Sequence, residues 1–418
     1  MYIIAIYGEE MKRDTDIKDD INNKSNIDVK KKRSICFFIF NIIAVLVCTG
    51  AVMHFSPAIA PRLLGFNENA AAAFAPAEFV KENKENSSDN SDNTAKSDNT
   101  TNTASKKNTT SASSDKDIDK DSDVYSGITE TPDDIAKLMA EAEKTIKSEK
   151  QTGKTSEEDY FGGGTLVSFN GVEVQSKIPD SFYKLNIESL LNQKAELSIK
   201  DVSKPTVLVY HSHTTESYTL LDVGYYTKSL DPRSDSKAKN MVRVGDDLCE
   251  YLEAMGISVI HDRTIHDTNY NTAYDSSRKA VEKYLEKYPT IEITIDVHRD
   301  DITYKDKTKV KPTAVINNKK AARMMIIAGA QYGSIENYPD WEYNLRFDLA
   351  VQQKVNEMYP GLMRPVLFSQ RKYNMDETRN SFLLEIGTDA NTLDEACYSA
   401  RLFATALAEL IKEDYVEK

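Results

Sequence analysis

Clustered positive charge is scarce in this chain of 418 residues, and histidine and cysteine are rare. The 53 Lys and Arg residues are outnumbered by 66 Asp and Glu residues, which gives a formal net charge of −13. Nucleic acid is therefore not expected as a partner, because phosphate binding needs clustered Lys and Arg. The chain also lacks a G-x-S-x-G motif, which disfavours a serine hydrolase although Ser212 and Ser217 lie near histidines.

The chain has only four cysteines. Cys36 and Cys48 lie in a long apolar run near the start of the chain. Cys249 and Cys397 fall in helix-like patterns, where single cysteines usually act as small buried apolar residues. The sequence leaves a disulfide between these two open, since pairing depends on geometry that spacing does not show.

The apolar run, residues 34–55, has about the length needed to cross roughly 30 Å of hydrocarbon. A basic cluster at residues 30–33 precedes it, so the positive-inside rule predicts a cytoplasmic tail at residues 1–33 and an extracytoplasmic remainder. A cleaved signal peptide is the alternative, since residues 58–60 resemble a cleavage site. The long polar extension before the run favours an uncleaved, single-pass anchor in the cell membrane.

Composition predicts three segments after the anchor. Residues 56–130 are expected to form a disordered extracytoplasmic tether, because most of them are polar and cannot bury enough surface to offset the entropy of ordering. Residues 131–203 are expected to form a helical and adaptor segment. Residues 204–418 are expected to form the catalytic domain.

Apolar strand-like runs and amphipathic helix-like runs alternate within residues 204–418. Strands are predicted at 207–210, 257–262, 291–298, 313–317, 365–370 and 382–387, and helices at 240–255, 276–287, 340–358 and 392–413. This alternation predicts an α/β fold with a mostly parallel central sheet and helices on both faces. In such sheets the functional site lies outside the carboxyl ends of the strands.

Candidate metal ligands lie at the ends of two of the predicted strands, and a candidate catalytic residue lies near the end of a third. His213 and Glu216 come directly after the first strand, and His298 ends another strand about 80 residues later. Imidazole and carboxylate are good ligands for Zn²⁺, and three protein ligands leave a fourth position for water. Glu385 lies in an apolar run where a carboxylate is costly unless it is paired or near a metal. We expect Glu385 to act as the general base and acid of a hydrolase.

Three further residues are supporting candidates. His211 lies two residues before His213 and faces the same side, so either could bind the metal, although the position of His213 beyond the strand favours it. Asp296 is placed to accept the second ring proton of a histidine ligand. Arg299 is placed to anchor a substrate carboxylate through its planar guanidinium. For Asp296 and Arg299 a structural salt bridge is an equal alternative.

The segments VLVYHSHTTESY, TIDVHRD and YNMDETRNSFLLEIGTDANT resemble the stage II sporulation protein P family, which are cell-wall hydrolases of endospore-forming bacteria. The resemblance runs from near Lys204 to the C-terminus. The two histidine segments and LLEIG are also similar to zinc-dependent N-acetylmuramoyl-L-alanine amidases, whose fold is shared with zinc carboxypeptidases. The resemblance implies amidase and endopeptidase cleavage of peptidoglycan during septal wall thinning and forespore engulfment. It also implies stage II sporulation proteins D and M as partners, and a location at the sporulation septum.

The chain departs from the amidase pattern at one ligand. In those amidases the glutamate usually lies more than ten residues after the first histidine, whereas Glu216 lies three residues after His213. Glu250 therefore remains an alternative ligand. The tight spacing also leaves open a zinc carboxypeptidase or endopeptidase without amidase action. A non-catalytic scaffold that binds the cell wall is the alternative from a different class.

Overall fold

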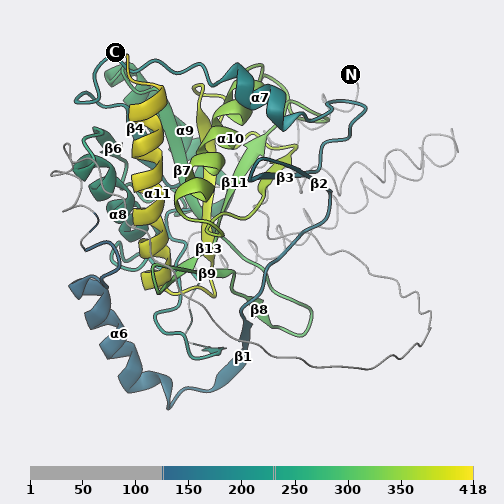
Figure 1. Ribbon diagram of the computed structural model, residues 1–418. Coiled ribbons are helices and arrows are strands. Elements are labelled where there is room, and N and C mark those ends of the chain that lie inside the picture. Colours follow the sequence, from purple (N-terminus) through teal and green to yellow (C-terminus); the bar gives the residue numbers. More distant parts are fainter. Residues whose placement is uncertain (1–124, 126, 229, 231, 418) are drawn as a thin grey trace, which may run out of the picture. The chain divides into compact units, whose positions relative to one another are not determined.

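The computed structural model describes residues 125, 127–228, 230 and 232–417 (Figure 1). The predicted anchor, the cytoplasmic tail and nearly all of the predicted tether lie outside these residues. Within the described part, no helix has both the length and the apolar character needed to cross a bilayer.

The main sheet has eight strands in the order β2-β3-β12-β11-β13-β7-β4-β6. Their bounds are Thr165–Phe169 for β2, Val172–Ser176 for β3, Val207–Tyr210 for β4, Val259–His261 for β6, Ile293–Asp300 for β7, Met324–Gly329 for β11, Val366–Ser369 for β12 and Ser381–Thr388 for β13. The β2–β3 and β11–β13 pairs are antiparallel, and the other five neighbouring pairs are parallel. The sheet is therefore mixed, and the predicted α/β class is confirmed.

Strands β4, β7, β11 and β13 are buried along their whole length. Strands covered on both faces read as continuous apolar runs, and this explains why three of them were predicted. The exception is β11, MMIIAG, which no prediction included. This run is short, and its apolar residues do not alternate with polar ones. It also begins with two methionines instead of β-branched residues. Such a pattern fits a strand and a buried helix equally well.

Helices cover both faces of the main sheet (Figure 1). Helices α8 (Met241–Ala254), α10 (Trp341–Met358) and α11 (Leu393–Asp414) pack in one large apolar core with residues such as Val209 and Leu384. Helix α9 (Ala273–Lys287) packs on the other face, where Val281 contacts Leu208 and Tyr210. The predicted two-sided cover is confirmed.

The start of the largest helix shows how local sequence sets an element. Thr392 accepts a hydrogen bond from the backbone N–H of Glu395, whose carboxylate accepts one from the backbone N–H of Thr392. This capping box satisfies two backbone donors that the first helical turn leaves unpaired.

Helix α11 carries Cys397 and α8 carries Cys249, and both cysteines are buried and free.

The segment before residue 204 joins the same structure. It contains α6 (Asp133–Ile146), β1 (Gln151–Ser156), α7 (Ile187–Gln193) and the edge strands β2 and β3 of the main sheet. Strand β1 lies between β5 (Tyr225–Thr227) and β8 (Lys309–Val310) in a separate three-stranded sheet, and β9 (Thr313–Ile316) and β10 (Lys319–Ala322) form a hairpin. The adaptor segment therefore contributes strands to the main sheet and to the three-stranded sheet. The domain boundary at residue 204 stays a prediction.

Candidate metal centre

The three strands that carry the predicted site residues are neighbours in the sheet. Strands β13, β7 and β4 run parallel and in that order, and Glu385 of β13 is the register partner of His298 of β7. The turn that follows β4 carries His213 and Glu216. The structure therefore places all four predicted residues at the carboxyl edge of these strands, where open α/β sheets bind ligands.

Hydrogen bonds to two aspartates hold the turn after β4. The Ser212 N–H and hydroxyl donate to the two carboxylate oxygens of Asp296, at 2.8 and 2.6 Å. The Thr215 hydroxyl donates to Asp267 at 2.6 Å, and the Glu216 N–H donates to the His213 carbonyl at 3.1 Å. Since these residues are buried, the turn presents His213 and Glu216 in a fixed orientation.

Two of the predicted ligands lie at the spacing of ligands on one metal ion. His298 Nδ1 is 3.4 Å from Glu216 Oε2, and two donors on a tetrahedral zinc lie about 3.3 Å apart. The His213 ring is 1% exposed, stands edge-on to the His298 ring with centroids 5.4 Å apart, and has no hydrogen-bond partner at either nitrogen. Burial, with the nearby His298 and Arg233 cations, lowers the pKa of His213 to about 4. The ring is therefore neutral, which is the form that binds metals.

The electrostatics of the site favour positive charge on the His298 ring and negative charge on Glu216. Burial works against ionisation of Glu216, but the His298 hydrogen bond and the Arg299 charge outweigh it and hold the Glu216 pKa well below its usual range. Burial also disfavours charged His298, yet Asp296 and Glu216 outweigh it and raise the His298 pKa. Asp296 Oδ1 lies 2.8 Å from His298 Nε2. The orienting role of Asp296 stays a prediction that this contact allows.

Among the described residues, no group of three or more His, Cys, Asp or Glu side chains has the spacing of a formed metal centre. The donor chemistry nevertheless fits a divalent ion such as zinc. His213 offers unpartnered nitrogens, Glu216 Oε1 has no hydrogen-bond partner, and the His298 to Glu216 spacing suits one ion.

Glu385 is buried beside the same group. Its side chain is 2% exposed, and its Oε2 atom has no hydrogen-bond partner. Burial, assisted by the charge of Asp300, raises the pKa of Glu385 well above its usual range. A raised pKa suits a carboxyl group that must both accept and donate a proton. Glu250, the alternative ligand, is exposed on the surface of α8, so Glu216 is the better placed of the two carboxylates.

Both ring nitrogens of His211 have partners. Its Nδ1 lies 3.0 Å from the Val297 carbonyl, and its Nε2 lies 2.9 Å from Nε2 of His261. Burial, together with the charge of His261, lowers the pKa of His211 to about 3. The carbonyl requires a proton on Nδ1, so Nε2 accepts from His261. His211 therefore links the end of β4 to β7 and β6, whereas both ring nitrogens of His213 have no partner within the described residues.

Arg299 does not have the role predicted for it. Its guanidinium donates to the carbonyls of Ser217, Pro232 and Asp300, at 3.0, 2.7 and 3.3 Å, and the residue is 3% exposed. The predicted anchor for a substrate carboxylate is wrong, because the planar group is already used inside the fold. Arg299 instead fixes the chain that follows Glu216.

Three residues that no prediction named surround the ligands. The Tyr270 ring stacks on His213 with centroids 4.4 Å apart. The Arg233 guanidinium lies 4.8 Å from the centroid of the Tyr270 ring and makes a cation–π contact with it. Arg233 Nη2 also lies 3.7 Å from Glu216 Oε1. The Tyr274 ring stands edge-on to His213 at 5.4 Å, and its buried hydroxyl has no hydrogen-bond partner. Tyr270 lies in the 3-10 turn Tyr270–Thr272 and Tyr274 lies in the first turn of α9, and only the tertiary structure shows that both rings meet His213.

Comparison with known proteins identifies one family. The family model for stage II sporulation protein P (SpoIIP) matches residues 62–408. Stage II sporulation protein P of Bacillus subtilis (strain 168) is 30% identical over 256 residues, which cover 56% of this chain and 60% of that protein. The matched region thus spans about six tenths of the relative's length.

Two solved structures resemble about half of the chain. The N-acetylmuramoyl-L-alanine amidase from Clostridium difficile 630 is 9% identical, with a TM-score of 0.32, and the match covers 51% of this chain and 99% of that chain. The CwlD amidase from Clostridioides difficile, solved in complex with the GerS lipoprotein, is 10% identical with a TM-score of 0.32, and the match covers 50% of this chain and 100% of that chain.

Proposed function

The chain belongs to the stage II sporulation protein P family, and from this premise we propose that it is a zinc-dependent N-acetylmuramoyl-L-alanine amidase with endopeptidase activity. Its substrate is peptidoglycan, and it acts in septal wall thinning and forespore engulfment. Residues 34–55 anchor it in the membrane with the catalytic part outside. Stage II sporulation proteins D and M are its partners.

One observation carries the proposal. The pair formed by His298 Nδ1 and Glu216 Oε2, 3.4 Å apart, is buried beside the unpartnered ring of His213. Buried polar atoms without partners are costly, and imidazole and carboxylate donors gathered in this way suit zinc. Glu385, the register partner of His298, supplies a carboxyl group on the adjacent strand.

His213, Glu216 and His298 would hold the zinc, which when bound polarises the amide carbonyl and lowers the pKa of water. Glu385 accepts a proton from the attacking water and delivers it to the leaving amine nitrogen, so that a C–O bond forms as the C–N bond breaks. Asp296 holds the His298 ring through Nε2. We assign the Tyr274 hydroxyl, which is buried without a hydrogen-bond partner, as a donor to the negative charge that would develop on the carbonyl oxygen.

A peptidase without amidase action is the second candidate, favoured by the three-residue spacing of His213 and Glu216. Product analysis separates the two, since an amidase releases whole stem peptides and leaves bare glycan. A peptidase leaves shortened or uncrosslinked stems attached to the glycan. A wall-binding scaffold would leave purified cell wall intact.

The test is elemental analysis of the purified full chain, followed by digestion of purified cell wall. We expect about one zinc per chain, lost in His298→Ala, and released stem peptides. Glu385→Gln is expected to keep the zinc and lose turnover, because the amide cannot exchange the proton. Glu250→Gln is the matched control and should keep both zinc and turnover. Full turnover in Glu385→Gln, or zinc retained by His298→Ala, would overturn the assignment.

A further inference from the structure

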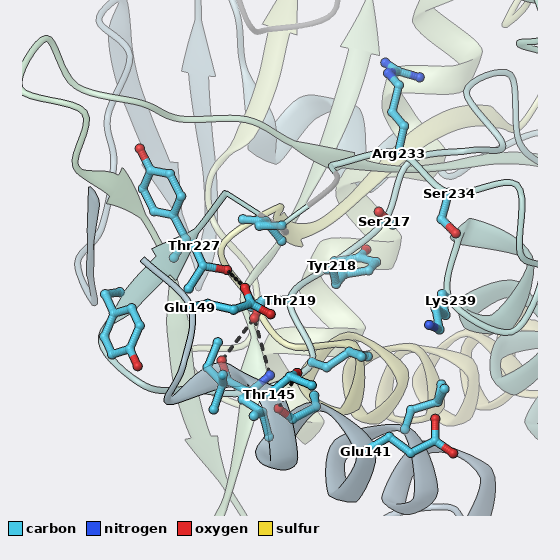
Figure 2. A pocket seen from close by; sticks show the side chains of 18 residues that line it. Glu141, Thr145, Glu149, Ser217, Tyr218, Thr219, Thr227, Arg233, Ser234 and Lys239 are labelled. Carbon is cyan, nitrogen blue, oxygen red and sulfur yellow. Dashed lines mark hydrogen bonds between the residues drawn. The ribbon is translucent and has the colours of Figure 1, made fainter. Parts of the chain in front are cut away.

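A pocket of about 400 Å³ adjoins the candidate metal centre (Figure 2). It is lined by one face of α6, by residues 217–221, by β5, and by Arg233, Ser234 and Lys239. Its volume falls in the range of about 300–1,000 Å³ typical of small-ligand sites. It is too large for a single ion and too small for a folded partner.

The pocket and the metal centre share a wall. Ser217, which lines the pocket, directly follows Glu216, and its carbonyl accepts the Arg299 Nε–H at 3.0 Å. Arg233 lines the pocket and also lies 3.7 Å from Glu216 Oε1. A ligand in the pocket would therefore lie one side chain away from the candidate ligand Glu216.

The position in the fold also suits a substrate. The three-stranded sheet that carries β5 is attached beyond the carboxyl edge of the main sheet, since the Thr388 hydroxyl at the end of β13 donates to the Val310 carbonyl of β8 at 2.7 Å. Ligands of open α/β sheets bind beyond this edge. The segment that precedes the predicted catalytic domain thus builds one wall of the pocket through α6.

The two walls carry opposite charges. The α6 side provides the carboxylates of Glu141 and Glu149, and the facing loop provides the cation of Lys239 (Figure 2). The Arg233 guanidinium points away from the pocket in Figure 2 and pairs with Asp267 at 2.8 Å. Glu149 accepts a hydrogen bond from the Thr227 hydroxyl. Within the described residues, Glu141 and Lys239 form no side-chain hydrogen bond or ion pair. The walls between them carry leucine, isoleucine and tyrosine side chains.

A ligand that satisfies both walls must carry an amine and a carboxylate on a partly apolar frame. A short peptide has these groups, whereas a neutral sugar has neither and a polyanion would be repelled by Glu141. We propose that the pocket binds the peptide portion of the substrate, with a carboxylate toward Lys239 and an amine toward Glu141. This inference rests on the proposed function, because it takes the metal centre next to the pocket as the place of cleavage.

The test is titration calorimetry of the full chain with the synthetic tripeptide Ala-Glu-Lys, its C-terminal amide, and its form acetylated at both amines. Each charge contact is expected to contribute about fivefold in affinity, the equivalent of about 1 kcal/mol for a partly exposed pair. Lys239→Gln should remove the preference for the free carboxylate and keep the preference for the free amines. Glu141→Gln should do the reverse.

Matched controls lie on the same two elements. Glu143 is on α6, and Lys237 is on the same loop as Lys239, but neither lines the pocket. Glu143→Gln and Lys237→Gln should bind all three peptides as the parent chain does. If the control variants lose as much peptide affinity as Glu141→Gln and Lys239→Gln, the effect is one of general charge and the inference is overturned. Tighter binding of the neutral disaccharide chitobiose than of the tripeptide would also overturn it.

Repeating the titration with chelator separates this inference from the proposed function. If chelated protein binds the peptides with the charge preferences described above, while the zinc-loaded chain does not hydrolyse cell wall, the result would support the pocket and refute the amidase. Cell-wall hydrolysis by a chain that binds none of the peptides would refute the pocket and leave the amidase standing.

Discussion

Replacing Gly245 by alanine should destabilise this protein, although the same change stabilises most helix interiors. Gly245 lies inside α8, where Gly→Ala usually contributes about 1 kcal/mol of stability. A Cβ atom at this position would lie 2.6 Å from His211 Nε2 and 2.6 Å from His261 Nε2. These distances are well inside van der Waals contact, so at least one imidazole must move.

Neither ring can move freely. His211 Nδ1 is held by the Val297 carbonyl at 3.0 Å, and His261 Nδ1 lies 3.1 Å from Asp246. Overpacking a dense core costs about 1–3 kcal/mol, and losing the contact between the two rings costs about 1 kcal/mol more. After the gain in helix propensity is subtracted, we expect a net loss of about 2 kcal/mol.

The assay is urea denaturation of the full chain, monitored through the fluorescence of Trp341, the single tryptophan. In the His261→Ala background one of the two blocking rings is gone, so adding Gly245→Ala there should cost less than about 1 kcal/mol. If Gly245→Ala alone is as stable as the parent chain, His211 and His261 do not pack on α8 as described. The reason for excluding His211 as a metal ligand would then fail.

Three further predictions concern the site and the core. Tyr274→Phe should lower turnover about 100-fold if its hydroxyl stabilises the oxyanion, whereas Tyr210→Phe, which also removes a buried unpartnered hydroxyl, should not; equal turnover in both variants would assign Tyr274 to packing. Asp348 is buried without a partner at either oxygen, and burial raises its pKa, so the folded state binds the proton more tightly and loses stability as pH rises from the unfolded pKa toward the folded one. Asp348→Asn should therefore be more stable relative to the parent chain at pH 7 than at pH 4. Urea midpoints that differ from those of the parent chain by the same amount at both pH values would contradict this. Zinc at 100 times its Kd should stabilise the parent chain by about 2.7 kcal/mol and leave the melting temperature of His298→Ala unchanged; an equal shift in both would place the zinc elsewhere.

The sequence by itself predicted the four helices and most of the strands after residue 204, and it suggested the donor residues. The α/β class followed from the alternation of apolar runs and amphipathic helices, because a strand buried on both faces must be apolar throughout. The ends of these runs also suggested His213, Glu216, His298 and Glu385, because functional sites of open α/β sheets lie at the carboxyl ends of the strands.

Only the tertiary structure decided which of these groups are available. The ring nitrogens of His211 contact Val297 and His261, which are remote in sequence. These contacts decide that His213, and not His211, has nitrogens available for a ligand. The use of Arg299 inside the fold depends on three backbone carbonyls, which carry no sequence signal because every residue has one. Tyr270 and Arg233 reach His213 and Glu216 through side-chain contacts across separate loops. A linear pattern records the period of a helix or strand, but such contacts are set by how the elements pack.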